Sequence, residues 1–568
     1  MFTIKTKILC IFFDEKSCQF RKKPYFCTRI WDGSSVGLER MLDRHEVTSS
    51  ILVRPTIKTL QSVFSINGRD VSPVGLERCL HTAEVTGSSP VRPTRSEQII
   101  ARFFICTYHT NSLSLPFQLK RAISIIQTDM MQHNIVPQDL AKKLFAESGL
   151  PSIGRAGIRE INKLAFDLEA ASGKKFIHME LGNPGLPAAR AGVEAQIKAL
   201  QNGVAANYPP IDGTPVLKKE ASRFIKNFLD LDVDPANCVP TVGSMQGAFA
   251  SFMIAGHSDA KKNTMLFIDP GFPVHKFQNK VLGIPMEHFD IYEYRGEKLR
   301  AKLEEVLSKG NIHSLLYSNP NNPTWVCLTD EELRIIGELT NKYNVIVMED
   351  LAYFGMDFRK DYSHPGEAPF QPTVGKYTDY YILMISSSKA FSYAGERCAI
   401  LGISDKLAQH HFPDLKAFCG QEVFLRAILF GALHPLSSGT SHSAQHALAA
   451  VLKAVNDGTY NYREDVLEYG RKAELMKKAF IDNGFYITYD EDCGEPIADG
   501  FYFTYCYPGF TGADLVEEML YYGVSGISLD TCGSTKQGVR ACTSLIQREE
   551  IPILAERLKA FAMDHPVK

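Results

Sequence analysis

Apolar positions three to four residues apart predict helices on both sides of a central region rich in short apolar runs. One helical stretch extends from Asn134 to Gly173. The helical period returns after the Ser/His-rich stretch Ser437–His442, in the segments Ala444–Val455 and Tyr462–Asn483. An α+β tail, Phe485–Phe561, follows these helices.

Runs of consecutive apolar residues between these helices predict buried strands. They are Thr264–Ile268, Ser314–Tyr317, Val345–Met348, Tyr380–Ile385 and Cys398–Ile403. The segment Glu331–Tyr343 between two of them has helical period, and strands that alternate with helices imply right-handed crossovers. We therefore predict an α/β protein with a large domain whose mainly parallel sheet is flanked by helices.

A smaller α+β domain is expected from both ends of the region after residue 129. We place an N-terminal arm and small-domain segment at 130–202, the large domain at 203–435 and a C-terminal small domain at 436–568. A chain of 568 residues with 45% hydrophobic residues is long enough for more than one domain core.

The first 129 residues differ in charge from the rest of the chain. They carry 18 Lys and Arg against 11 Asp and Glu, while the remainder carries 44 against 53. They also contain an internal repeat with an offset of 38 residues, since Val36–Arg40 returns as Val74–Arg78 and Val53–Thr56 as Val91–Thr94. Two copies without sustained helix or strand periodicity would bury too little surface for a solenoid.

A translated nucleic-acid sequence explains this repeat better than a basic nucleic-acid-binding arm, whose charges would be clustered. Gly87-Ser88-Ser89-Pro90 is what the T-arm of a transfer RNA gene encodes when read as GGT-TCG-AGT-CCN. We expect residues 1–129 to be translated tandem transfer RNA genes or disordered chain, with the true start at Met130 or Met131. A transfer RNA cloverleaf in the genomic DNA upstream of the Met130 codon would support this hypothesis.

Composition limits the cellular location, the metal and disulfide sites and the partners that can be expected of the protein. The 13 cysteines lack paired spacing, so we expect no disulfide framework, no metal site and a reducing, cytoplasmic location. No run of eighteen or more apolar residues occurs, and we read Met1–Phe13 as no signal peptide because Asp14, Glu15 and Lys16 follow it. We accordingly expect neither a membrane nor a nucleic acid as partner.

Three polar residues lie just past predicted strand ends, where ligands bind to parallel sheets. They are Asn322, Asp350 and Lys389. Lys389 has a serine hydroxyl at Ser386 and an arginine at Arg397, which suits a phosphorylated aldehyde cofactor that a lysine amine holds as a Schiff base. Taken alone, Lys389 would be interpreted as a surface residue and Asn322 as part of a turn. Together with Ser386 and Arg397, they favour a cofactor-binding site.

Together these segments resemble the fold-type I pyridoxal-phosphate enzymes, specifically the class I/II aminotransferases of the aspartate/aromatic type. The resemblance spans about residues 150–565. It implies pyridoxal 5′-phosphate as cofactor, with Lys389, Asp350 and Tyr353 as catalytic residues. The cofactor-binding residues that it implies are Gly243, Ser244, Met245, Phe272, Asn322, Asp350, Tyr353, Ser386, Ser388, Lys389, Arg397 and Tyr208.

Within this set, the resemblance gives each group a task. Asp350 would keep the pyridine nitrogen protonated, Tyr353 and Asn322 would contact the ring oxygen, and Phe272 would stack on the ring. Tyr208 resembles the tyrosine that reaches the cofactor phosphate of the neighbouring subunit, which implies a homodimer with shared active sites. The substrate-binding residues would be Arg540, Gly182 and Asn322, with Arg540 as a bidentate partner of the α-carboxylate.

The reaction expected from this resemblance is transamination of an L-amino acid with a 2-oxo acid by a ping-pong mechanism. A lyase or decarboxylase on the same fold uses the same motifs and remains an alternative. A transcription regulator with an aminotransferase-like domain is a further one, which would require a winged helix-turn-helix before residue 130. Trp325 stands where such enzymes usually have glycine and Gly271 is small, so the preferred amino acid stays open.

Overall fold

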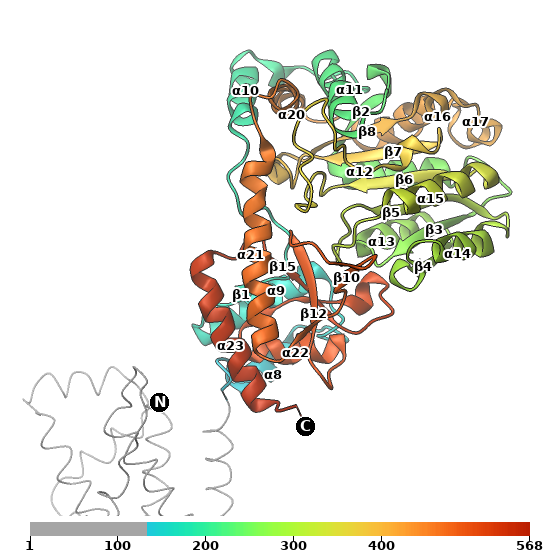
Figure 1. Cartoon of the computed structure of the whole chain (residues 1–568). Coiled ribbons are helices and arrows are strands. Elements are labelled where there is room, and N and C mark those ends of the chain that lie inside the picture. The colour runs from blue at the N-terminus through green and yellow to red at the C-terminus, as the bar shows by residue number, and fades with distance from the viewer. Residues whose placement is uncertain (1–132, 568) are drawn as a thin grey trace, which may run out of the picture. The chain divides into compact units, whose positions relative to one another are not determined.

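The computed structural model describes residues 133–567 (Figure 1). The interpretation of residues 1–129, the proposed start at Met130 or Met131 and any DNA-binding module before residue 130 lie outside the described residues. The predicted domain boundaries at 202 and 435 stay predictions.

A seven-stranded sheet forms the centre of the large domain, in the order β2-β8-β7-β6-β5-β3-β4. Its strands are β2 (Cys238–Val242), β3 (Thr264–Asp269), β4 (Met286–Asp290), β5 (Ile312–Ser318), β6 (Ile346–Leu351), β7 (Tyr381–Ser386) and β8 (Cys398–Ile403). The five strands from β7 to β4 are parallel, whereas β8 runs antiparallel to both of its neighbours. The mainly parallel sheet predicted from the sequence is confirmed.

Alternation of side chains along each strand divides the large domain into two cores. In β7, Leu383 and Ile385 enter one hydrophobic cluster while Ile382 and Met384 enter another. Helices α11 (Pro215–Leu229), α14 (Lys298–Leu307) and α15 (Asp330–Tyr343) pack into the first cluster. Helix α12 (Gly243–Ala255) and the π-helical turn Ala427–Leu433 pack into the second. Both faces of the sheet are therefore covered, which explains the continuous apolar runs in the sequence.

The two strands that the sequence did not predict, β2 and β4, lie at the edges of this sheet. Pro240 interrupts β2, and an edge strand tolerates a proline because one side of its backbone makes no ladder hydrogen bonds. Met286–Asp290 is largely polar and half-exposed, so it lacks the apolar run of a central strand.

The smaller domain joins both ends of the described chain. Strand β1 (Ile177–His178) pairs in parallel with β13 (Val524–Ser525), 347 residues later. A four-stranded antiparallel sheet follows the order β14-β15-β12-β9, with β14 (Ile527–Ser528), β15 (Val539–Cys542), β12 (Tyr502–Cys506) and β9 (Tyr486–Ile487). Its helices are α8 (Gln138–Glu147), α9 (Ile158–Ser172), α21 (Tyr462–Asp482), α22 (Gly512–Tyr521) and α23 (Ile551–Asp564). The predicted smaller α+β domain is confirmed.

Helix α20 (His442–Asn456) packs against α10 (Arg190–Gln201) and α11, and these helices lie together in Figure 1. No helix within residues 133–567 combines the length and the apolar character that crossing a membrane requires.

Candidate active site

The carboxyl ends of three adjacent strands bring Asn322, Asp350 and Lys389 to one edge of the sheet. Asp350 lies in β6, in register with Ser318 at the end of β5 and with Met384 near the end of β7. Asn322 and Lys389 follow β5 and β7 by a few residues. The convergence expected from parallel strands is present.

The Asp350 carboxyl is buried beneath this edge. The amide N–H of Ala352 donates to Oδ1 at 3.1 Å, and Nε2 of His275 in α13 (Pro273–Leu282) lies 4.0 Å from Oδ2. Burial raises the pKa of Asp350 to about 6 and lowers the pKa of His275 to about 4, so the imidazole is neutral at physiological pH. A cation beside Asp350 would therefore be strongly attracted to its carboxylate, because water solvates this carboxylate poorly.

Asn322, Tyr353 and Arg540 contact one another although they come from three separate segments. Nδ2 of Asn322 donates to the Tyr353 hydroxyl at 3.3 Å, and Nη1 of Arg540 donates to Oδ1 of Asn322 at 3.3 Å. The Tyr353 hydroxyl donates in turn to the hydroxyl of Tyr502 at 2.9 Å. The small-domain strands β12 and β15 thus meet the large-domain sheet at this point.

Arg540 is only 1% exposed, and its hydrogen bonds go to neutral acceptors. These are the Asn322 amide oxygen and the backbone carbonyl of Glu180, while its Nε has no partner among the described residues. A buried guanidinium without a carboxylate partner is costly, and the bidentate geometry of a substrate carboxylate would satisfy it.

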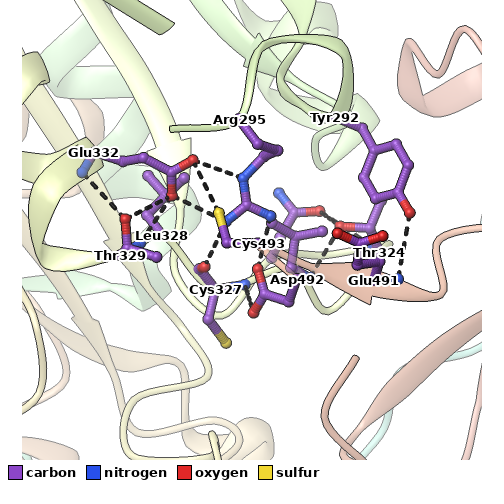
Figure 2. A network of polar contacts seen from close by, with 12 residues as sticks. Tyr292, Arg295, Thr324, Cys327, Leu328, Thr329, Glu332, Glu491, Asp492 and Cys493 are labelled. Atoms are coloured by element: carbon purple, nitrogen blue, oxygen red, sulfur yellow. Dashed lines mark hydrogen bonds and ion pairs between the residues drawn. The ribbon is translucent and has the colours of Figure 1, made fainter. Parts of the chain in front are cut away.

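A buried ion-pair network holds the loop that carries Asn322. Figure 2 shows Arg295 between Glu332 and Asp492, with Nε to Glu332 Oε1 at 2.7 Å and Nη1 to Asp492 Oδ1 at 2.6 Å. Asp492 and Arg295 also hold the backbone of Cys327. The Cys327 N–H donates to Asp492 Oδ2 at 3.2 Å, and Arg295 Nη2 donates to the Cys327 carbonyl at 3.1 Å. At the other end of the loop, Ser318 Oγ accepts from the Asn322 N–H at 3.2 Å.

Lys389 is part-buried and lies between the backbone of Gly182 and the ring of Phe501. Its amine donates to the Gly182 carbonyl and lies 5.3 Å from the centroid of the Phe501 ring. Burial lowers the pKa of the amine to about 8, and the charges of Arg540 and Arg397 act in the same direction. A lysine of this kind is neutral in a useful fraction at physiological pH and can act as a nucleophile or a base.

An anion site is available at the N-terminus of α12, which begins at Gly243. The N-cap residue Val242 provides no side-chain cap, so the first amides of the helix need an acceptor. The Gly243 N–H already donates to the Arg397 carbonyl at 2.9 Å, which leaves the amides of Ser244 and Met245 for an anion. Gly243 has φ +66°, and a Cβ there would clash with the Arg397 guanidinium.

The serines before Lys389 differ in their burial. Ser386 is buried, and its hydroxyl accepts from the Ser388 N–H at 3.1 Å, while Ser388 is half-buried. Phe272, the N-cap residue of α13, is half-buried and meets the His275 ring edge-on at 5.3 Å between centroids. Tyr208 is 90% exposed and so is not buried with the other predicted site residues.

Comparison with known proteins decides the family. The sequence signature of the family "Aminotransferase class I and II" matches residues 174–558. The chain belongs to this family. It is an aminotransferase.

Among its relatives is a "Probable aspartate aminotransferase" of Methanocaldococcus jannaschii, 25% identical over 344 residues, which are 60% of this chain and 83% of that protein. The "Glutamate-pyruvate aminotransferase AlaC" of Escherichia coli is 26% identical over 321 residues, 56% of this chain and 70% of the relative. The structure of an aspartate aminotransferase from Thermotoga maritima has a TM-score of 0.59 at 18% identity and covers 74% of this chain and 98% of its own. That structural likeness shows the fold, as predicted.

Trp325 lies in the same loop as Asn322. It adopts φ +66°, a left-handed conformation in which glycine is unstrained, and its indole is fully buried. The indole meets the Tyr353 ring at 5.5 Å and the Tyr502 ring at 6.2 Å. The position where the resemblance led us to expect a glycine therefore carries a large side chain packed against Tyr353 and Tyr502.

Two residues that contact the predicted site residues Asp350 and Tyr353 were not predicted from the sequence. His275 and Tyr502 come from α13 and β12, and both read from sequence as ordinary core aromatics. The period of the strand or helix places them in the core, but only packing between separate elements shows which polar group each one meets.

Proposed function

We propose that this aminotransferase binds pyridoxal 5′-phosphate and transfers an amino group between an L-amino acid and a 2-oxo acid in a ping-pong cycle. The observation that carries the proposal is the buried Arg540, which contacts Asn322 beside Lys389 and lacks a carboxylate partner among the described residues. When bound, the cofactor supplies a carbonyl that bonds to amines and a ring that accepts the electron pair of the substrate Cα.

The residues present fit such a group. Asp350 would hold the proton on the pyridine nitrogen, and the pairing would return its carboxyl to the ionised form. Asn322 and Tyr353 would donate to the ring oxygen, and the α12 amides with Ser386, Ser388 and Arg397 would bind the phosphate. Phe272 would cover the ring.

Lys389 would hold the cofactor before the substrate arrives and then carry a proton between the substrate Cα and the cofactor. Its lowered amine pKa supports this second task, because a base works best with a pKa near the operating pH. Arg540 and the backbone of Gly182 would hold the α-carboxylate and so select which Cα bond breaks.

Relatives named for aspartate, for glutamate and pyruvate, and for LL-diaminopimelate act on different amino acids, so their names do not choose a substrate. We propose a homodimer in which Tyr208 reaches the partner's cofactor phosphate, because its ring is 90% exposed in the single chain. A cytoplasmic location stays a prediction; the eight cysteines among residues 133–567 are free.

Substitution of Lys389 by Ala tests the proposal. We expect loss of the lysine-linked cofactor absorbance and at least about a 10⁴-fold loss of transamination, because covalent capture and proton transfer both fail. Lys472, a buried lysine that donates to the carbonyls of Ser544 and Ile546, is a control: Lys472→Met should leave the absorbance intact. An unchanged spectrum in the Lys389→Ala variant would contradict the assignment.

A further inference from the structure

Tyr502 contacts two groups that the proposed function places at opposite ends of the substrate site. It begins β12, is buried, and pairs with Cys542 of β15. Its hydroxyl lies 2.9 Å from the Tyr353 hydroxyl, and the centroid of its ring lies 4.6 Å from Cζ of Arg540. Under the proposed function, Tyr353 would contact the ring oxygen of the cofactor and Arg540 would bind the substrate carboxylate.

These contacts close a circuit of four side chains. Arg540 donates to Asn322, Asn322 donates to Tyr353, Tyr353 bonds to Tyr502, and the Tyr502 ring lies against Arg540. Burial raises the pKa of both tyrosines well above the usual range, so both hydroxyls keep their protons. Two neutral hydroxyls in contact can each donate one hydrogen bond, and their direction can reverse by rotation of the hydrogens.

We propose that Tyr502 is a positioning residue that couples the carboxylate site at Arg540 to the phenol of Tyr353. The proposal rests on the proposed function. If Tyr353 donates its proton to an oxygen of the bound cofactor, the Tyr502 hydroxyl would donate to Tyr353 in turn and would strengthen that hydrogen bond cooperatively. When a carboxylate pairs with Arg540, the charge over the Tyr502 ring is neutralised, which changes the strength of the Tyr502 hydroxyl as a donor.

The surroundings of Tyr502 hold it in this place. The Trp325 indole packs edge-on against its ring, and a Cβ on Gly182 would clash with its hydroxyl. Gly182 is also the residue whose carbonyl accepts from Lys389. A side chain confined on both sides cannot move away when its partners change, so changes pass to Tyr353.

The test is a spectrophotometric pH titration of the cofactor band in the holoenzyme, with and without succinate as a carboxylate that carries no amine. Tyr502→Phe keeps the ring over Arg540 and removes the hydroxyl. We expect the apparent pKa obtained from the cofactor absorbance to rise by about 0.5–1 unit, the effect of losing one neutral hydrogen bond. The change in this apparent pKa that succinate causes should become smaller.

Tyr505→Phe is the matched control. Tyr505 lies on the same strand, is fully buried, and its hydroxyl has no partner among the described residues. It should titrate as the wild type does. Tyr502→Leu also removes the ring, and should weaken succinate binding about two- to tenfold, the range for loss of a cation–π contact.

A double variant separates coupling from general disturbance. If Tyr502 acts through Tyr353, Tyr353→Phe/Tyr502→Phe should titrate like Tyr353→Phe alone. Additive shifts, or a Tyr502→Phe titration identical to that of Tyr505→Phe, would overturn the proposal while leaving the proposed function intact. A wild-type protein without any lysine-linked cofactor band would instead overturn the proposed function.

Discussion

The site contains two buried charges of opposite sign, and the molecule positions them by different means. Asp350 lies on a central parallel strand, where strand order alone brings it beside Asn322 and Lys389. Arg540 lies on an antiparallel strand of the smaller domain and reaches the same place only because β12 and β15 pack against the Asn322 loop.

The two charges also differ in their partners. Asp350 accepts a backbone N–H and has a neutral imidazole 4.0 Å away, whereas Arg540 donates to two neutral oxygens. Neither has an opposite charge as a bonded partner among the described residues. In each case a bound molecule would supply it: a pyridinium for Asp350 and a carboxylate for Arg540. The comparison suggests that one half of the site serves the cofactor and the other half the substrate.

Arg540→Ala should break the carboxylate half and leave the cofactor half intact. Loss of a bidentate charge pair in a buried site is expected to cost about 2–5 kcal/mol of transition-state stabilisation. This loss would appear as a lower kcat/KM, mainly through a higher KM for the amino acid. The cofactor absorbance should persist. Arg540→Lys keeps the charge without the fork and should recover part of the loss. Steady-state kinetics equal to those of the wild type would remove Arg540 from the site.

Asp350→Asn should break the cofactor half. An amide cannot hold the pyridine nitrogen protonated, so we expect kcat to fall about 10²-fold with a smaller change in KM, the usual effect of removing one electrostatic group. Glu349→Gln is the control, because Glu349 points to the opposite face of the sheet and bonds to Thr373 at 2.6 Å. Equal losses in both variants would show that stability, and not chemistry, is affected.

The pH dependence of stability sharpens the difference between the halves. In the cofactor-free protein, burial raises the pKa of Asp350 from 3.8 to about 6, so the folded state holds its proton more tightly than the unfolded state. Stability from this group is greatest at low pH and is lost as pH rises through 4 to 6. Asp350→Asn should remove about 3 kcal/mol of that pH dependence in denaturant unfolding.

If the free energy of unfolding depends on pH identically in the cofactor-free wild type and in Asp350→Asn, the pKa of the Asp350 carboxyl is not raised by burial. Added cofactor should reduce the same difference in the wild type, because the bound cation compensates the ionised form. Arg540 stays charged throughout this range, so Arg540→Lys should keep the wild-type profile.

The convergence of part of the predicted cofactor site could be anticipated from the sequence, because polar residues at or just after the carboxyl ends of adjacent parallel strands meet at one edge of the sheet. Asn322, Asp350 and Lys389 are examples. The predicted carboxylate site is harder to anticipate from the sequence, since Arg540 was predicted only from the family resemblance and Tyr502 was not predicted at all. The contact between Tyr502 and Tyr353 joins residues 149 positions apart, and no local period encodes it.

Trp325 shows a related limit. From the sequence it is a departure from an expected glycine; the structure shows that the backbone keeps a left-handed φ of +66° there and that the indole fills space beside Tyr353 and Tyr502. The strain of that conformation is offset by burial of a large aromatic surface. Neither the conformation nor the burial follows from the residue type.

If both halves of the site act together in amino-group transfer, a single half-reaction shows it most directly. The purified holoenzyme is mixed with an amino acid that it accepts and with no 2-oxo acid. We predict release of one 2-oxo acid per active site, with no ammonia or CO₂, and no further turnover until an oxo acid is added. Continued release of ammonia or CO₂ without an acceptor would contradict transamination and indicate a lyase or decarboxylase.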